Sequence, residues 1–439
     1  KKMPPIGSAL CPSTSFFFRS PLQSNPRSLQ SHKHIFKICV VATTNRGKLT
    51  AEAMVSTTEQ TVSFGFKNLT ETFLVDVQRA EGKPLNVPLM APLTIGSSSR
   101  FERVDNVAIR VELSNGCVGW GEASMVPSVT LENQTMALAK AREVCDFLRQ
   151  SQPMTLNLLL DQIGGFIPAH EFASVRAGVE MALIDAVASS IDVPLWRLFG
   201  GVSNTLTTTI TIPTDSPAEA SELASKYCKQ GFNFFKLKLG NNLNSDVKVL
   251  QAVRAVQPTC SFILDANEGY TSKEAIEVLE KLNDMGVIPV LFEQPVHRHD
   301  WEGLSHVSDV ARDKYGISVA ADESCESLVD VQKIIQENIA DVINIRLGKL
   351  GVLGALKIIE VARKSGLNMM IGGMTETRLS TGFAGHLAAG LGCFKYIDLD
   401  APFLLSEDPV VGGYEVSGAV YKFINARGQG GFLSWDVAW

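Results

Sequence analysis

The sequence has few cysteines and no long hydrophobic run. Its 439 residues include 8 cysteines, with 45% hydrophobic and 20% charged residues and a mean hydropathy of +0.10. No stretch approaches eighteen uninterrupted apolar residues, which excludes a transmembrane helix, and we expect no membrane partner. A soluble chain of this length exceeds one ordinary hydrophobic core, so we expect two domains.

The cysteines are too scattered to suggest a disulfide framework or a zinc site. No two of them form a CxxC pair, and none has a histidine at metal-site spacing. This pattern predicts reduced thiols in an intracellular compartment.

Acidic residues are missing from the start of the chain. Residues 1–51 contain eight Lys or Arg and no Asp or Glu, which leaves a net charge of -14 for the rest. Rich in Ser and Pro, they cannot bury enough surface to fold, and the short apolar piece at 38–42 suits an organellar leader better than a secretory one. We predict a disordered transit peptide that directs the protein to the chloroplast stroma, with the mitochondrion as second choice. An ordinary disordered tail is the alternative for these residues. The net negative charge of the rest of the chain argues against a nucleic-acid partner.

Beyond Leu206 the chain repeats a unit in which a β-branched or aromatic run ends in polar residues and a helical pattern follows. The eight strand candidates are Thr207–Ile212, Phe232–Leu239, Phe262–Asp265, Val290–Glu293, Ile317–Asp322, Val342–Leu347, Asn368–Ile371 and Tyr396–Asp398. From Lys238 the polar residues that end the strands recur at intervals of 27, 28, 29, 27, 24 and 25. Such regularity indicates repeated βα units.

Eight strand–helix units within about 190 residues predict an α/β fold with a parallel, TIM-like (β/α)8 barrel over residues 206–400. A doubly wound sheet is the alternative, but the chain has no G-x-G-x-x-G turn after its first strand. Residues 73–124 alternate like antiparallel strands and residues 136–198 have a helical pattern. We expect residues 73–195 to form an N-terminal α+β capping domain over the barrel mouth, completed by about residues 401–439.

Lysine alternates with leucine in the second predicted strand, Phe235-Lys236-Leu237-Lys238-Leu239. With a period of two, both lysines share one face, so in a barrel the leucines would face the helices and the lysines the interior. We expect each ammonium group to lower the pKa of the other, which would suit a general base near neutral pH. An amphipathic edge strand is the alternative.

Three carboxylates, Asp265, Glu293 and Asp322, end three successive predicted strands. Each alone could be a surface acid or a helix cap. Together they would repel strongly unless a cation lay between them, and oxygen ligands favour Mg²⁺ over Zn²⁺. We therefore predict one Mg²⁺ per subunit, bound by carboxylates that have no basic partner of their own.

Two further groups follow from the barrel geometry. Lys349 follows the sixth strand, which lies four strands from the second, so Lys238 and Lys349 are predicted to face each other across the mouth. A solvated loop lysine is the alternative for Lys349. Asp398 and Asp400 share one face at the eighth strand, across the mouth from the metal, where they would suit a cationic end of the substrate.

These motifs resemble the muconate-lactonizing subgroup of the enolase superfamily over nearly all of residues 73–439. The matching motifs are Lys236-x-Lys238, Asp265-x-Asn267, Glu293-Gln294-Pro295, Asp322-Glu323-Ser324 and Lys349. Within the subgroup, Asp398-x-Asp400-Ala401-Pro402 resembles the dipeptide epimerases, typified by L-Ala-D/L-Glu epimerase.

The resemblance implies roles for the residues. Asp265, Glu293 and Asp322 would bind Mg²⁺, Lys238 and Lys349 would be the two acid/base groups, and Lys236 an electrostatic aid. The list is completed by Asp398 and Asp400, which would clamp the dipeptide's α-ammonium group, and by Thr211, which would contact the substrate. In the family a flexible capping loop can supply an arginine to the substrate side chain, and the loop at 96–104 offers Arg100 or Arg103.

The resemblance implies a dipeptide whose C-terminal residue is inverted at its α-carbon, and the paired lysines predict inversion, the reaction of an isomerase. One lysine would remove the α-proton, and the opposite lysine would return a proton to the other face of an enediolate. We expect a homo-oligomer. The alternatives are o-succinylbenzoate synthase or another cycloisomerase of the superfamily, a Schiff-base aldolase, and a non-catalytic barrel.

Overall fold

The computed structural model describes residues 65–437 except 96–98, 127–128, 169–170, 214–215 and 240–242. The predicted transit peptide, residues 1–51, lies outside the described residues and stays a prediction. Within the described part, no helix is long and apolar enough to cross a membrane. The six cysteines there form no disulfide; they are Cys117, Cys145, Cys228, Cys260, Cys325 and Cys393.

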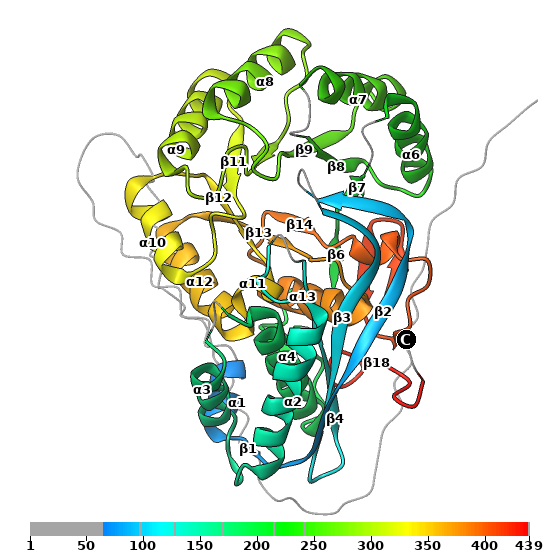
Figure 1. The fold of residues 1–439 in the computed structure, drawn as a ribbon, viewed down its shortest axis with the longest axis vertical. Helices are drawn as coiled ribbons and strands as arrows, with labels where there is room; N and C mark the ends of the chain where they lie inside the picture. The colour runs from blue at the N-terminus through cyan, green and yellow to red at the C-terminus, as the bar shows by residue number, and fades with distance from the viewer. Residues whose placement is uncertain are drawn as a thin grey trace, which may run out of the picture. The chain divides into compact units, whose positions relative to one another are not determined.

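Eight parallel strands form the barrel, which confirms the predicted fold class (Figure 1). They are β7 (Ile210–Ile212), β8 (Phe234–Lys238), β9 (Ser261–Asp265), β10 (Leu291–Glu293), β11 (Ser318–Ala321), β12 (Val342–Ile345), β13 (Asn368–Gly372) and β14 (Tyr396–Asp398), paired in chain order. The amide of Thr209, just before β7, donates to the carbonyl of Ile397 in β14 at 3.0 Å, which brings the first and last strands together.

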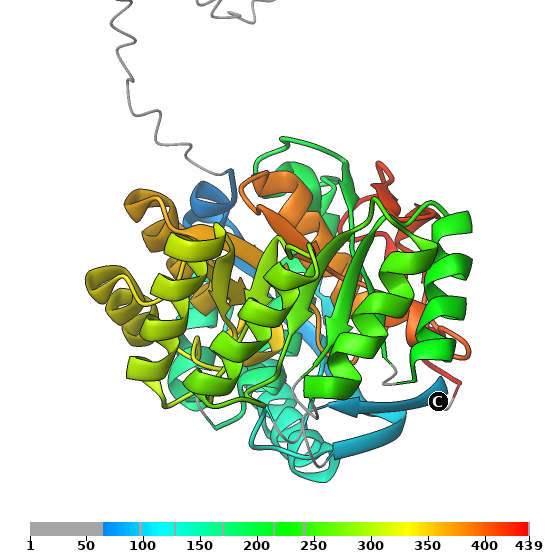
Figure 2. The same ribbon diagram turned by 90° about the horizontal axis from the view of Figure 1, so that it is seen from above.

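Helices follow the strands and lie outside them, as Figure 2 shows for the green and yellow segments. They are α6 (Pro217–Lys229), α7 (Leu243–Val256), α8 (Ser272–Asp284), α9 (Trp301–Val310) with the π-helix η1 (Ala311–Tyr315), α10 (Leu328–Glu337), α11 (Leu347–Leu350), α12 (Val352–Ser365) and α13 (Arg378–Leu391), followed by the 3-10 helix η2 (Ala401–Leu404). Local capping explains several starts: Thr271 and Glu274 form a complete capping box at α8.

The period of two along each strand separates an inner from an outer set of side chains. A small inner cluster fills the barrel; it consists of Ile263, Leu291, Ala320, Val342, Met370 and Tyr396. Neighbouring residues of the same strands, such as Phe262 and Leu264, belong to the larger core beneath the helices. The same alternation places Leu237 in that outer core and Lys236 inside, as the sequence predicts.

The N-terminal part is a three-stranded antiparallel sheet packed on helices. Its elements are α1 (Gly65–Thr72), β1 (Leu74–Val75), β2 (Val77–Ile95), β3 (Ser99–Leu113), β4 (Val118–Ala123), α2 (Gln134–Gln150), β5 (Met154–Thr155), α3 (Leu156–Phe166), α4 (Ala173–Ser190) and α5 (Leu195–Leu198). β2 and β3 form one long hairpin with an irregularity between Pro88 and Leu93. The predicted capping loop at 96–104 is therefore wrong in extent, because residues 99–104 are strand.

The C-terminal residues pack against two earlier segments of the chain, a strand that precedes the barrel and the long β2–β3 hairpin. Their strands are β15 (Val411–Gly412), β16 (Tyr414–Ser417), β17 (Val420–Phe423) and β18 (Gly431–Phe432). β17 pairs with β6 (Thr205–Thr207), so the single strand predicted over Thr207–Ile212 is in fact two strands in different sheets. Leu405 and Leu433 pack in one cluster with Leu85 and Val87 of the long hairpin.

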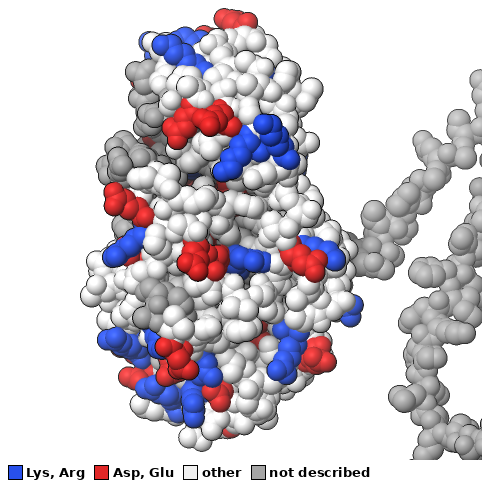
Figure 3. Space-filling model, turned by 90° about the vertical axis from the view of Figure 1, so that its right-hand side faces the viewer, with Lys and Arg blue, Asp and Glu red and all other residues white. Residues whose placement is uncertain are grey.

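Charged side chains are spread over the face in Figure 3, where acidic and basic groups alternate without a continuous stripe of either sign.

Helix α4 is the element that both cores share. Its hydrophobic residues are buried on all sides: Val175 and Val179 belong to the N-terminal core, and Met181 and Ile184 to the barrel core. β4 crosses it in backbone contact. A Cβ atom added to Gly121 would lie 1.9 Å from the carbonyl oxygen of Gly178, and one on Gly119 would lie 2.0 Å from that of Ala182.

This contact predicts that Gly121→Ala lowers the free energy of unfolding by about 3 kcal/mol, because backbone rather than a movable side chain must shift. Urea unfolding followed by circular dichroism measures the change. Gly165→Ala is the matched control. A Cβ atom at this exposed helix position meets no atom of a described residue within 4 Å, so the substitution should be neutral or stabilise by up to about 1 kcal/mol. Equal stability of Gly121→Ala and wild type would contradict the predicted contact.

Candidate active site

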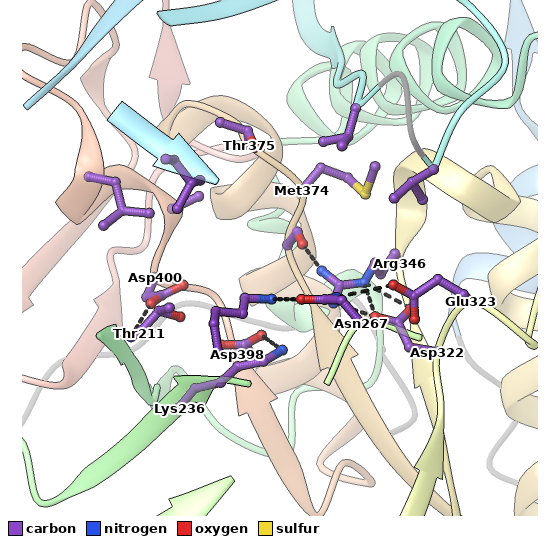
Figure 4. Close-up of a pocket in the computed structure, with 17 residues that line it drawn as sticks. Thr211, Lys236, Asn267, Asp322, Glu323, Arg346, Met374, Thr375, Asp398 and Asp400 are labelled. Carbon is purple, nitrogen blue, oxygen red and sulfur yellow. Dashed lines mark hydrogen bonds and ion pairs between the residues drawn. The ribbon is translucent and has the colours of Figure 1, made fainter. Parts of the chain in front are cut away.

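A pocket opens at the carboxyl ends of the barrel strands, where the fold class places its chemistry (Figure 4). Barrel residues form its floor, and Leu93, Val126 and Val129 of the N-terminal part form one wall. The cavity encloses about 670 Å³, counting the space open to solvent. All three predicted metal-binding carboxylates, both lysines of the Lys-x-Lys motif and both strand-eight aspartates lie in it or directly beneath it.

Lys236 lies at the centre of these groups. Its ammonium nitrogen is 2.9 Å from Asp265 Oδ2, 2.8 Å from Glu293 Oε2 and 2.8 Å from Asp398 Oδ2, and the side chain is 1% exposed. The expectation that the three carboxylates have no basic partner is therefore wrong. Asp398 was predicted to lie across the barrel mouth from the metal ligands. It does not, since the Lys236 nitrogen contacts Asp398 together with Asp265 and Glu293.

The pKa values of this group reflect burial and pairing together. Burial lowers the pKa of Lys236, but Asp265, Asp398 and Glu293 outweigh it and hold that pKa well above its ordinary value. The predicted mutual lowering by two lysines is thus wrong for Lys236, because its carboxylate neighbours are closer. Burial raises the pKa of Asp265, but the ammonium groups of Lys236 and Lys238 lower it to about 2.

Arg346 is the site residue that the sequence analysis missed. Its guanidinium donates from Nε to Asp322 Oδ2 at 2.8 Å, lies 3.3 Å from Glu293 Oε1 and also donates to the carbonyl of Gly373. Asn344, two residues earlier, donates to Glu293 Oε1 at 2.8 Å. The signal was present in Asn344-Ile345-Arg346, because two polar residues alternating with an apolar one on a barrel strand indicate inward-facing polar groups.

Lys238 reaches the pocket from the end of β8. It donates to Asp265 Oδ2 at 2.7 Å and to Asn267 Oδ1 at 2.9 Å, and its side chain is 23% exposed. Asn267 in turn donates to Glu323 Oε1 at 3.1 Å, while Glu323 Oε2 is buried with no hydrogen-bond partner among the described residues. Lys238 is therefore both oriented by its neighbours and accessible to a ligand.

Lys349 lies on α11, directly after β12. Its ammonium group donates to Asp322 Oδ1 at 2.8 Å, and the residue is 8% exposed. β8 and β12 are four strands apart in the eight-stranded order, so Lys238 and Lys349 approach the carboxylates from opposite sides of the barrel. Asp265 and Asp322, the partners of the two lysines, lie at the ends of β9 and β11.

The strand-eight aspartates differ in their surroundings. Asp398 accepts from Lys236 and from the Thr209 hydroxyl at 2.9 Å. Asp400 Oδ2 accepts from the backbone amide of Thr211 at 2.5 Å and forms no ion pair with a described residue. Burial and the neighbouring Asp398 raise the pKa of Asp400 to about 6. Asp400 is the one of the two whose charge is available to a cationic ligand.

The described site holds more carboxyl groups than cationic groups. Six carboxylates, Asp265, Glu293, Asp322, Glu323, Asp398 and Asp400, face four cations, Lys236, Lys238, Arg346 and Lys349. Burial and Asp265 raise the pKa of Glu293 to about 8, and burial and Asp322 raise that of Glu323 to about 7. Both shifts are the consequence of neighbouring carboxylates in a buried place.

The donor set fits a hard divalent cation by its chemistry. All donors are carboxylate oxygens at the ends of neighbouring strands, and Glu293 Oε2, although close to Lys236, accepts no hydrogen bond from the described part of the chain. Among the described residues, however, no three carboxylates already surround a common point where an ion could bind. Binding of an ion would have to move the ammonium and guanidinium groups that now contact these oxygens.

Strained backbone holds the carboxylates in place. Asn267, Glu268 and Gln294 have positive φ angles of 42°, 69° and 34°, which residues other than glycine rarely adopt. Gln294 Oε1 accepts from the amides of Asp322 at 2.9 Å and Ser324 at 3.1 Å. The end of β10 is thereby tied to the end of β11.

Of the two predicted arginines of the capping part, only Arg103 has a described side chain, and it does not line the pocket. The side chain of Arg100 lies outside the described residues. Arg103 pairs with Asp105 at 2.7 Å, with 61% of its side chain exposed, and lines a neighbouring cavity instead. Thr211, by contrast, lines the pocket, and its contact with a substrate stays a prediction.

The fold and site together define a barrel enzyme with a capping domain. Residues 219–437 match the family "Enolase C-terminal domain-like", and residues 79–200 match "Mandelate racemase / muconate lactonizing enzyme, N-terminal domain". The chain therefore belongs to the enolase superfamily, in its mandelate racemase and muconate lactonizing enzyme family, which confirms the resemblance seen in the sequence.

Three similar proteins carry related names. An "L-Ala-D/L-amino acid epimerase" of Populus trichocarpa is 67% identical, over 87% of this chain and 90% of that protein. The substrate-liganded L-Ala-D/L-Glu epimerase of Bacillus subtilis has a TM-score of 0.77 at 32% identity, covering 82% of this chain and 99% of that one. A dipeptide epimerase of Enterococcus faecalis, complexed with Mg and L-Leu-L-Tyr, has a TM-score of 0.75 at 30% identity, covering 81% and 99%. The chain is accordingly an isomerase of this family.

The position of Lys236 predicts that Lys236→Met lowers the free energy of unfolding in EDTA by about 3–5 kcal/mol, because three buried carboxylates lose their common cation. Excess Mg²⁺ should restore more stability to this variant than it adds to wild type. Urea unfolding with and without Mg²⁺ measures both effects.

Lys364→Met is the control, because its pair with Glu360 is 74% and 66% exposed and should contribute under about 0.5 kcal/mol. A Lys236→Met protein as stable as wild type in EDTA would show that the buried pairing has no energetic role.

Proposed function

We propose that the protein is a dipeptide epimerase that inverts the α-carbon of the C-terminal residue by proton transfer between two lysines. The observation that carries this proposal is the position of Lys238 and Lys349 on opposite sides of the barrel, each held by a carboxylate of one cluster. Inversion requires a proton acceptor on one face of the carbon and a donor on the other. The names of the similar proteins support the same reaction.

Asp265, Glu293 and Asp322 would hold the Mg²⁺ ion. When bound, the ion would act as a Lewis acid that withdraws charge from the substrate carboxylate and makes the α-proton easier to remove. The surplus of carboxyl groups in the described site and its oxygen-only donors support this assignment. Lys236 and Arg346 would supply the remaining positive charge beside the carboxylate end of the substrate.

The two lysines would exchange roles with the direction of reaction. In one direction Lys238, in its neutral form, takes the α-proton while protonated Lys349 donates its own to the opposite face. In the other direction the roles reverse, and one proton is taken up for each one released. Asn267 and Asp265 fix the Lys238 nitrogen, and Asp322 fixes that of Lys349.

Asp400 and Asp398 would bind the free amino terminus of the dipeptide. The pocket wall formed by Leu93, Val126 and Val129 is apolar. A dipeptide with an apolar side chain would therefore suit this described wall.

Lys238→Ala and Lys349→Ala should each lower net epimerisation by at least about 10²-fold, because each removes one of two required proton carriers. Each variant keeps one base. In D₂O, each should therefore still exchange the α-proton of one epimer only, and the two variants should select opposite epimers. Mass spectrometry of each purified epimer after incubation measures the exchange.

Lys364→Ala, an exposed lysine, should behave as wild type in the same assay. If either active-site variant interconverts epimers near the wild-type rate, that lysine is not a proton carrier and the two-base proposal fails.

N-acetylation of the dipeptide should lower kcat/KM by at least about 10²-fold, because the acetyl group removes the charge that Asp400 would bind. N-methylation keeps the positive charge and is the matched control, for which we expect a much smaller effect. Steady-state polarimetry measures both. If acetylation leaves kcat/KM unchanged, the substrate is not held by its ammonium group, and a cycloisomerase or o-succinylbenzoate synthase reaction gains support.

A further inference from the structure

Glu122, near the end of β4, is a buried carboxylate that the proposed mechanism does not use. It is 0% exposed, and no Lys, Arg or His among the described residues forms an ion pair with it. Burial and the nearby Glu376 raise its pKa to about 7. An apolar residue would fill this place at lower cost, so the packing of the sheet alone does not explain a carboxylate here.

Most of its described hydrogen-bond donors come from one barrel segment, which comprises the end of the connection between β13 and α13 and the first turn of α13. Glu122 Oε2 accepts from the Thr377 hydroxyl at 2.6 Å and from the Ser380 amide at 3.2 Å, and Oε1 accepts from the Thr377 amide at 3.1 Å. Asn106 of β3 joins the contact, because its amide nitrogen donates to Glu122 Oε1 at 2.7 Å and to the Thr375 carbonyl at 2.9 Å. The capping sheet thus holds both ends of residues 375–377.

The same segment is a wall of the active site. Gly373, Met374 and Thr375 line the pocket (Figure 4). The carbonyl of Gly373 accepts from Arg346, and its amide donates to the carbonyl of Asp398 at 2.8 Å. A shift of this segment would therefore move the pocket wall and change the support of Arg346 at once.

We propose that Glu122 is a positioning residue, which fixes the 373–377 segment from the capping sheet and thereby gives the pocket its substrate-binding geometry. The inference rests on the proposed dipeptide epimerase activity. By this proposal the capping domain forms one wall of the pocket itself and also fixes a second wall, which belongs to the barrel.

Glu122→Gln tests the proposal, because the amide group keeps the size of the side chain but replaces one acceptor oxygen with an NH₂ group, which cannot accept hydrogen bonds from Thr377 and Ser380. We expect KM for the dipeptide to rise about tenfold, with a smaller change in kcat, at a temperature where the variant is fully folded. Glu112→Gln is the matched control: Glu112 lies in the same sheet and pairs with Arg110 at 2.7 Å, away from the segment. Its KM should equal that of wild type.

A second readout does not depend on activity. Hydrogen–deuterium exchange of the free protein should be about tenfold faster at the Thr377 and Ser380 amides in Glu122→Gln, and unchanged there in Glu112→Gln.

If Glu122→Gln does not fold, Thr377→Val and Thr377→Ser replace it. Valine removes the hydroxyl that donates to Glu122 and should raise KM, whereas serine keeps the hydroxyl and should leave KM at the wild-type value.

The outcomes separate the two proposals. Absence of epimerase activity in the wild-type protein would refute the proposed function. An active wild type together with a Glu122→Gln KM within twofold of it, whatever the melting temperature, would overturn the positioning role. A KM equally raised in Thr377→Val and Thr377→Ser would overturn it as well.

Discussion

The ammonium group of Lys236, buried between Asp265, Glu293 and Asp398, is the interaction on which the rest of the site depends. It lets carboxylates from three strands lie close together inside the barrel, where alone they would repel or become protonated. Arg346 likewise pairs with Asp322 and compensates the charge of that carboxylate. Because the six carboxyl groups of the described site still outnumber its four cations, a divalent ion and the amino terminus of a substrate are the partners that would complete the balance.

The capping part and the barrel are joined by packing and hydrogen bonds as well as by the pocket between them. Helix α4 contributes side chains to both cores, β4 approaches its backbone through glycines, and Glu122 reaches from the sheet into the barrel connection after β13. Because both parts form or support the pocket walls, a substrate bound between the two parts has little freedom to move. This constraint matters for proton transfer, since a carbon displaced by about 1 Å from its lysine loses much of the rate.

The sequence predicted the barrel and most site residues because both depend on local patterns. The period of two in the Lys236–Lys238 strand sets which side chains point inward, and the spacing of strand ends brings Asp265, Glu293 and Asp322 to one edge. A sequence pattern does not show which side chains contact one another in the folded protein. For that reason the pairing of Lys236, the contribution of Arg346 and the strand structure at 99–104 were missed, and the single first strand was predicted where two sheets meet.

The proposed reaction requires an α-carbon that lies between two lysines beside one divalent ion. Crystals grown with Mn²⁺ and a dipeptide that lacks the reactive α-proton, such as one ending in α-methylalanine, would show this arrangement directly through anomalous scattering. We predict a single Mn²⁺ peak bound by Asp265, Glu293 and Asp322, with the Lys238 and Lys349 nitrogens on opposite faces of the substituted carbon. A peak elsewhere, or both nitrogens on the same face, would contradict the account.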